Sequence, residues 1–146
     1  MKQVYSVCLL LAVILCAVSG CSRSNPVAEL QQAIEKYRAI SKTARDFQFD
    51  VRKTDSVVSP YVGTIDYTLD WNNEEGKPIG RVKCAASFAY QQGKWIAKNV
   101  VGVVVEAVVS SDKEPDLESW GAVFEVLQAP KEVRQWQDAL DMRAVP

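Results

Sequence analysis

The chain has 146 residues, a formal net charge of −1 and no histidine. Its length suits a single domain of ordinary size. The near balance of 17 basic and 18 acidic residues argues against a nucleic-acid-binding protein, which needs a basic surface to replace phosphate counterions. Without histidine, the chain lacks the usual general base near neutral pH and the commonest metal ligand, which disfavours many enzyme classes.

An apolar segment near the start of the chain has the pattern of a bacterial signal peptide. Residues 7–18 are apolar throughout, follow Lys2, and precede the small residues Ser19 and Gly20. This run is about a dozen residues long, whereas a helix that spans a bilayer needs roughly 20. We therefore predict a cleaved signal over residues 1–20 rather than a transmembrane helix.

The signal ends in Val18-Ser19-Gly20-Cys21, which resembles the lipobox of bacterial lipoproteins. In that family the cysteine is acylated and becomes the first residue of the mature protein. The resemblance implies that Cys21 carries lipid, with acyl chains such as palmitate, and that the protein is attached to a membrane of the cell envelope. Because each buried methylene contributes about 0.8 kcal/mol, two or three long chains give a stable anchor.

The residue after the cysteine, Ser22, resembles the class of lipoproteins sorted to the outer membrane, with the domain facing the periplasm. Only a short tether then separates the lipid from the domain, so the domain should lie close to the bilayer. The expected organisation is a signal peptide over residues 1–20, a lipidated tether over 21–25, an α+β domain over 26–110 and a C-terminal segment over 111–146.

One other cysteine remains once the signal is removed. Cys8 and Cys16 lie within the signal, so Cys84 has no partner for an internal disulfide. Cys84 shares its strand phase with Val82 and Phe88, and no histidine can activate it. We predict a buried thiol that packs as a small apolar residue, not a nucleophile.

The domain begins with a predicted helix over residues 26–45. Asn25 is a favourable N-cap, and Pro26 is a favourable first helical residue. Apolar residues then recur at spacings of three and four, which places them on one side of a helix. They are Val27, Leu30, Ile34, Tyr37 and Ala44.

Four strands are predicted after the helix from the alternation of apolar and polar residues. Polar residues at 72–80 and at 92–93 form the last two connections. The residues expected to face the core are Phe47, Phe49 and Val51, then Tyr61, Gly63, Ile65, Tyr67, Leu69 and Trp71, then Val82, Cys84, Ala86, Phe88 and Tyr90, and finally Trp95, Ala97, Val101, Val103 and Val105.

The last two strands are expected to form a hairpin with a two-residue turn. That turn pairs Tyr90 with Trp95 and Cys84 with Val101, which places all four on one face. The order of one helix and an antiparallel meander is an α+β layer. It resembles cystatin-like and NTF2-like small domains, with residues 88–95 the nearest match. The resemblance covers roughly half of the chain and assigns no functional residue.

The second and third strands are expected to pair Trp71 with Val82, which places Asp70 beside Lys83 on the solvent-exposed face of the sheet. Asp66 shares that face with Asp70. Four residues of strand separate the two carboxylates by about 13 Å, beyond the roughly 5 to 9.5 Å of paired catalytic carboxylates. We interpret them as part of a solvated face.

The opposite face of the last hairpin is not fully polar, so we expect another segment to cover it. Residues 116–129 are the candidate, and both a helix and a fifth strand over 122–127 fit their composition. A further short helix is predicted from Pro130. The partly apolar face comprises Ala85, Ala89, Ile96, Val100 and Val104, and the helical stripes comprise Leu117, Trp120, Phe124 and Leu127, then Val133, Trp136 and Leu140.

Five residues are candidates for a pocket. Asn99 has an inward phase, and a buried amide must be hydrogen-bonded, so it either stabilises local structure or lines a cavity. Tyr67, Trp71, Tyr90 and Trp95 are expected on the same side of the sheet. There they form either part of the core or a cleft for a small molecule.

These patterns favour a lipid-anchored envelope protein that catalyses no reaction and binds another envelope protein or has an accessory role. The alternative is a pocket for a small apolar ligand between helix and sheet. An enzyme ranks third, because no acid and base converge. We expect no cofactor, metal or nucleic acid; the expected partners are the membrane, through Cys21, and an envelope protein.

Overall fold

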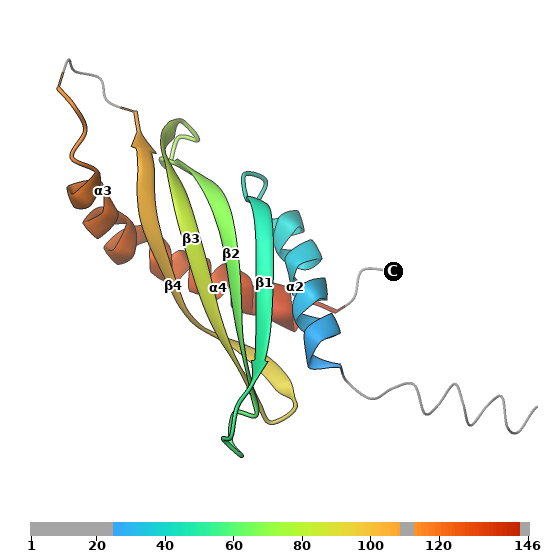
Figure 1. Ribbon diagram of the computed structural model, residues 1–146. Coiled ribbons are helices and arrows are strands. Elements are labelled where there is room, and N and C mark those ends of the chain that lie inside the picture. The colour runs from blue at the N-terminus through green and yellow to red at the C-terminus, as the bar shows by residue number, and fades with distance from the viewer. Residues whose placement is uncertain (1–24, 109–112, 144–146) are drawn as a thin grey trace, which may run out of the picture.

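The computed structural model describes residues 25–108 and 113–143 and has an α+β fold (Figure 1). An N-terminal helix precedes a four-stranded antiparallel sheet and a C-terminal helical region, which confirms the predicted fold class. The elements are α2 (Pro26–Ile40), β1 (Arg45–Lys53), β2 (Tyr61–Asn72), β3 (Pro78–Gln91), β4 (Lys94–Ala107), α3 (Leu117–Val123), the π-helical turn η1 (Phe124–Gln128) and α4 (Ala129–Asp141).

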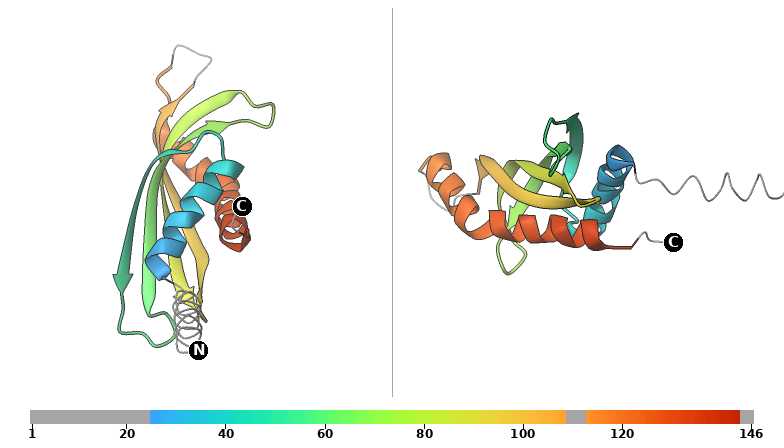
Figure 2. Two further views of the ribbon diagram at one scale, coloured as in Figure 1. Left: turned by 90° about the vertical axis from the view of Figure 1, so that its right-hand side faces the viewer. Right: turned by 90° about the horizontal axis from the view of Figure 1, so that it is seen from below.

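The strands lie in chain order, β1-β2-β3-β4. Helices α2 and α4 both pack on one face of this sheet, termed the inner face, and leave the outer face uncovered (Figure 2). The prediction that the C-terminal segment covers the outer face is therefore wrong. The reason is that both helices contribute to one aromatic core: Trp136 of α4 stacks on Tyr37 of α2, with 3.8 Å between ring centroids.

Helix α2 begins as predicted and ends earlier. The Asn25 side chain accepts hydrogen bonds from two backbone N–H groups of the first turn, as an N-cap does. The helix ends at Ile40 rather than residue 45, because Ser41 has an extended backbone; its N–H still donates the last helical bond, to the Tyr37 carbonyl. Val27 is exposed, so the buried stripe of α2 starts one turn later than predicted.

Strand β4 contains a bulge that changes which of its side chains face the core. Tyr90 pairs with Trp95 as predicted. Lys98 is then an extra residue between two paired positions, and it moves the following side chains to the opposite face. Cys84 consequently pairs with Gly102, one residue beyond the predicted partner. Val100 and Val104 are buried, whereas Val101, Val103 and Val105 are exposed, which is the reverse of the prediction.

The register between β2 and β3 differs from the prediction by two residues. Asp70 pairs with Arg81 rather than Lys83, and every predicted pair across this loop moves by the same amount. The connection is tighter than expected because the Asn73 N–H donates to the Lys77 carbonyl at 2.8 Å. Since side chains alternate with a period of two, the even shift leaves each of them on its predicted face.

The C-terminal region is helical, so the helix alternative for residues 116–129 is correct and the fifth strand is not. Asp116 caps α3 by accepting a hydrogen bond from the Ser119 N–H. The π-helical turn η1 ends just before Pro130, which has no N–H to donate to an earlier carbonyl. The wider turn places this proline inside an otherwise continuous helical region.

Side chains from this helical region reach the free edge of β4. The Ala97 N–H donates to Gln137 Oε1 at 3.0 Å, and the Gly102 N–H donates to Glu125 Oε1 at 3.1 Å. Free N–H groups on an edge strand are available to pair with other chains. The C-terminal region therefore satisfies part of this edge while it covers the inner face.

Candidate functional site

The residues predicted to form a pocket do not come together. Tyr67, Trp71, Tyr90 and Trp95 lie on the inner face, are buried, and pack against neighbouring aromatic rings. Asn99 is exposed on the outer face, so its predicted inward orientation is wrong. The bulge in β4 causes the difference. Asn99 and the four aromatic side chains therefore do not line a common cavity.

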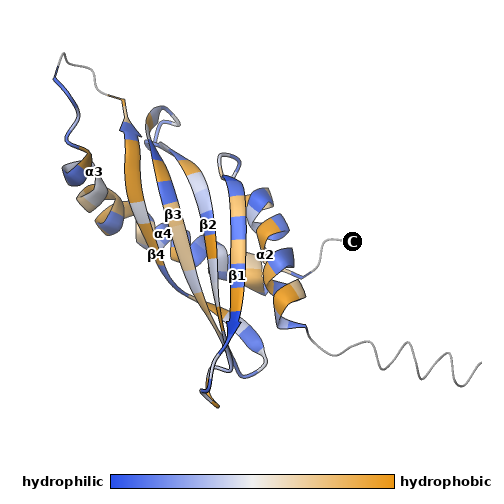
Figure 3. Cartoon of the chain, viewed as in Figure 1, coloured by the Kyte–Doolittle hydropathy of each residue, from blue (hydrophilic) through white to orange (hydrophobic). Residues whose placement is uncertain are grey.

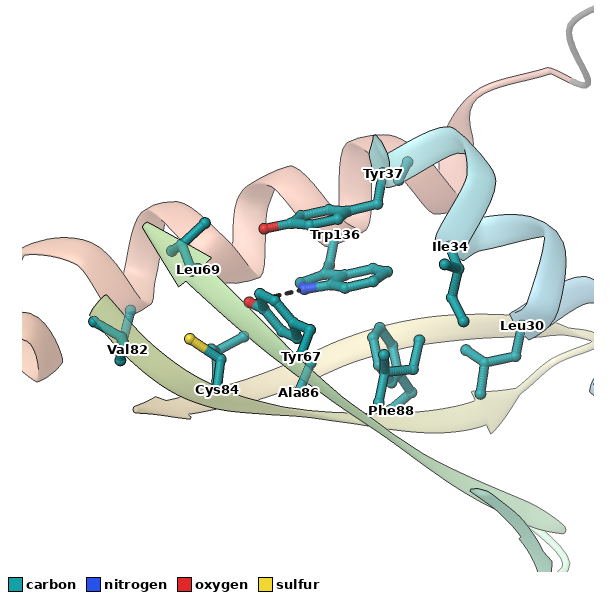
Figure 4. Close-up of a cluster of buried hydrophobic side chains, with 14 of the residues drawn as sticks. Leu30, Ile34, Tyr37, Tyr67, Leu69, Val82, Cys84, Ala86, Phe88 and Trp136 are labelled. Atoms are coloured by element: carbon teal, nitrogen blue, oxygen red, sulfur yellow. Dashed lines mark hydrogen bonds between the residues drawn. The ribbon is translucent and has the colours of Figure 1, made fainter. Parts of the chain in front are cut away.

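A buried carboxyl group lies at the centre of the inner face. Glu132 of α4 is 0% exposed. Its Oε1 accepts hydrogen bonds from the Tyr37 hydroxyl at 2.7 Å and from the Tyr67 hydroxyl at 3.1 Å. Trp136 Nε1 donates to the Tyr67 hydroxyl at 3.1 Å (Figure 4). These four residues are termed the buried polar cluster.

Three elements position the buried polar cluster. Tyr37 comes from α2 and Tyr67 from β2, while Glu132 and Trp136 lie four residues apart on α4 and so project from the same side of that helix. The Trp136 ring is parallel to Tyr37, at an interplanar angle of 4°, and meets Phe88 edge to face. The cluster therefore joins both helices to the sheet.

Burial shifts the pKa values of these groups. It raises the pKa of Glu132, against the opposing effect of the two tyrosine hydrogen bonds. Burial, followed by the charge that Glu132 carries when it is ionised, raises the pKa of both Tyr37 and Tyr67. Burial also raises the pKa of Cys84 to about 12, so this thiol is neutral at neutral pH. The predicted burial of the Cys84 thiol is confirmed.

The other carboxyl oxygen, Glu132 Oε2, accepts no hydrogen bond from any residue that the structure describes. A charged oxygen left unpaired in the interior is strongly destabilising, so this geometry also favours the protonated acid. All four side chains of the buried polar cluster are enclosed by the core. The cluster can therefore hold elements together and change charge with pH, but a dissolved substrate does not reach it in this structure.

Glu132 was not among the site residues predicted from the sequence. The predicted stripe on this helix included Val133, Trp136 and Leu140, and the structure leaves the first and last of these only partly buried. The fully buried positions are Ala129, Glu132, Trp136 and Ala139. A carboxylate in helical phase with a tryptophan four residues later is the signal that could have identified the site.

The outer face carries an exposed apolar strip. On β4, Val101 is 46% exposed and Val103 is 66% exposed, within a run of apolar residues that Figure 3 shows along this strand. Strand pairing places Val101 beside Ala85 and Val103 beside Lys83 of β3. The outer apolar strip comprises Val62, Ala85, Ala89, Ile96, Val101 and Val103, with the polar pair Ser87 and Asn99 between its two ends.

Charged residues form a network at one end of the outer face. Arg45 donates to both carboxylate oxygens of Asp70, at 2.8 and 3.0 Å. Arg81 lies 3.5 Å from Asp70 and 3.2 Å from Glu106. The Arg45 hydrogen bonds lower the pKa of Asp70. A cleft of about 360 Å³ borders this network, but the charges that line it are paired with one another.

The described part of the chain contains neither a candidate metal site nor a membrane-spanning helix. Within residues 25–108 and 113–143, no group of three or more cysteine, aspartate or glutamate residues could hold a metal ion. In that same part of the chain, no helix combines the length and apolar character needed to cross a bilayer. Cys21 and the lipobox lie outside the described residues. The chain matches no protein family model, no curated protein and no solved structure.

Proposed function

We propose that the protein is a lipid-anchored component of the cell envelope, at the periplasmic side of the outer membrane, whose domain binds another protein and catalyses no reaction. The lipobox-like sequence ending at Cys21 supports the anchor. The observation that carries the binding role is the outer apolar strip, since exposed apolar patches of this kind often mark interaction surfaces.

The charges around the strip suggest the chemistry of the partner. Lys83 lies opposite Val103, and Lys98 reaches toward Gln91 on the same face. Neither lysine forms an ion pair among the residues that the structure describes. The complementary partner is an envelope protein whose apolar surface is bordered by carboxylates facing these lysines and by a cation or hydrogen-bond donor facing Asp66, which lies beside Ala85.

The anchor is tested by the mass of the mature N-terminus. We expect a protein that begins at Cys21 and carries the added mass of a diacylglycerol and an N-acyl chain. A Cys21→Ser variant should be released from membranes in soluble form. An unmodified Cys21, or an N-terminus elsewhere, is incompatible with the proposal.

The partner surface is tested by photocrosslinking in intact cells. A photoactivatable residue in place of Val103 should crosslink to one defined envelope protein. The matched control is Val126, which is 73% exposed on η1, outside the sheet. The crosslink from position 103 should be lost in a Lys83→Glu variant. Equal crosslinking from both positions, or none from position 103, contradicts a partner on the outer face.

A further inference from the structure

The start of the domain and Val57 lie at the same end of the sheet. Val57 has the most exposed of the large apolar side chains that the structure describes. The β1–β2 loop, the β3–β4 turn and the start of α2 all lie at the lower end of the molecule in Figure 1 and in the left view of Figure 2. Trp95 Nε1 donates to the Pro26 carbonyl at 2.7 Å, and Gln91 Nε2 donates to Ser59 Oγ at 2.8 Å. These bonds tie α2 and the loop to the same hairpin.

The β1–β2 loop, residues 54–60 and termed the tip loop, directs two valines away from the protein. Val57 is 96% exposed and Val58 is 72% exposed. The loop is closed by a hydrogen bond from the Thr54 N–H to the Pro60 carbonyl at 2.8 Å. Ser56 Oγ accepts a further bond from a backbone N–H within the loop, at 3.1 Å. The valines therefore project from a hydrogen-bonded turn and have no core to enter.

Charged side chains of both signs surround the tip loop, and lysines are among them. Lys53 ends β1, Lys94 begins β4, and Lys98 lies in the β4 bulge. The acidic residues at this end are Asp55 in the loop, Asp50 on β1, which pairs with Arg52, and Glu29 and Asp141 beside Lys94. Exposed apolar side chains with neighbouring lysines are the composition of surfaces that enter the boundary between headgroups and acyl chains.

The length of chain before α2 brings this end to the bilayer. Four peptide units separate Cys21 from Asn25, so the two residues are at most about 14 Å apart. A lipid on Cys21 holds that residue at the membrane surface. The domain must then present the end that contains Pro26, and with it the tip loop, toward the same surface.

We propose that Val57 and Val58 of the tip loop insert into the bilayer interface beside the lipid on Cys21, as a second contact that orients the domain. The inference rests on the proposed lipid anchor. With the tip loop in the membrane, the long axis of the sheet stands away from the bilayer, and the outer face remains open to a partner.

The test measures membrane depth on the full-length lipidated protein in vesicles of phosphatidylethanolamine and phosphatidylglycerol. A Val57→Cys variant carries a polarity-sensitive fluorophore, and lipids brominated on their acyl chains act as the quencher. Cys84 is buried, so the new thiol reacts selectively. The control is Val126→Cys on η1, which lies far from the tip loop. This turn contacts β4 at Gly102, and Gly102 is eight residues, or about 26 Å along the strand, from Lys94.

We expect quenching at position 57 to exceed that at position 126 by about twofold or more. Val58→Asp should reduce the quenching at position 57 by about half, and Val103→Asp, on the outer face, should leave it unchanged. Equal quenching at positions 57 and 126 overturns the insertion. Shielding of the fluorophore at position 57 that appears only when a protein extract is added, and not with lipid vesicles alone, also overturns the insertion.

The mass of the same protein separates this proposal from the proposed anchor. A lipidated N-terminus with no preferential quenching at position 57 means that the anchor is present and the insertion is wrong. An N-terminus without lipid refutes the anchor, whatever the quenching shows.

Discussion

On the inner side of the sheet, Trp136 and Glu132 of α4 are 0% exposed between the helices and the strands, whereas on the outer face Val103 keeps 66% of its surface exposed. Both faces belong to the same four strands, whose side chains alternate between them. The inner face concentrates aromatic rings and one unpaired carboxyl oxygen. The outer face combines a valine strip with paired charges.

The difference separates the residues that hold the fold together from those that remain available for contact. Changes on the inner face should alter the free energy of unfolding, because they affect packing and a buried charge. Changes on the outer face should have small effects on unfolding and larger effects on binding. The two faces should also respond to pH in opposite directions, because Glu132 and Asp70 have pKa values shifted in opposite senses.

The largest expected effect comes from Trp136→Ala. The ring is fully buried between Tyr37 and the sheet, so its removal should lower the free energy of unfolding by about 3–5 kcal/mol. Val103→Ala on the outer face should change it by no more than about 0.5 kcal/mol. Urea unfolding of both variants measures the contrast. Similar losses for the two would mean that the outer face is also part of the core.

A smaller loss is expected from Gly102→Ala. A Cβ atom at this position overlaps the Phe124 ring and the Val82 side chain, so the variant should lose about 1–3 kcal/mol. Gly121 in α3 has open space around the same added atom. Gly121→Ala should stabilise the protein by about 0.5–1 kcal/mol through helix propensity. Thermal unfolding should therefore shift in opposite directions for the two alanines.

Glu132→Gln should remove a pH dependence of stability. Because the folded protein raises the pKa of Glu132 above 4.5, its stabilising contribution is complete below that value and is lost as pH rises through the raised pKa. Relative to the variant, the natural protein should lose stability with increasing pH, by up to about 1.4 kcal/mol per pH unit. Urea unfolding of both proteins from about pH 4 to about pH 8 measures this difference. Parallel curves would contradict the assigned burial.

The smallest effect is expected from Asp70→Asn on the outer face. Arg45 lowers the pKa of Asp70 below 3.8, so this pair stabilises the fold above that value and the contribution is lost as pH falls through the lowered pKa. Both side chains are more than one third exposed, which limits the effect to less than about 1 kcal/mol.

The control for that pair is Asp66→Asn. Asp66 lies on the same strand and face as Asp70 and forms no ion pair within the described residues. Its substitution should leave acid unfolding unchanged. An equal effect of the two substitutions would assign the change to net charge rather than to the Arg45 contact.

Part of the fold could be predicted because local patterns were unambiguous. Alternation placed Tyr67, Trp71 and Cys84 on the inner face, and it did so despite a register error of two residues. The pattern was insufficient in β4, where consecutive valines are compatible with either face. A bulge at Lys98 decided between them, and Asn99 moved to the outer face with it.

The candidate site depended on contacts between distant segments. Glu132 is polar, and 95 residues of sequence separate it from the Tyr37 hydroxyl that donates to it. No local pattern records such a bond, because it forms only when α2 and α4 pack on the same face. The same packing left the outer face open, although its apolar residues had suggested a cover.

The sequence by itself determined the α+β class, the start of α2 at its Asn25 cap, and the faces of β2 and β3, because these depend on capping and on a two-residue period. Only the tertiary structure decided which face the helices cover, how β4 is phased, and that Glu132 is buried. Those outcomes depend on how a few large side chains, above all Trp136, fill one shared core.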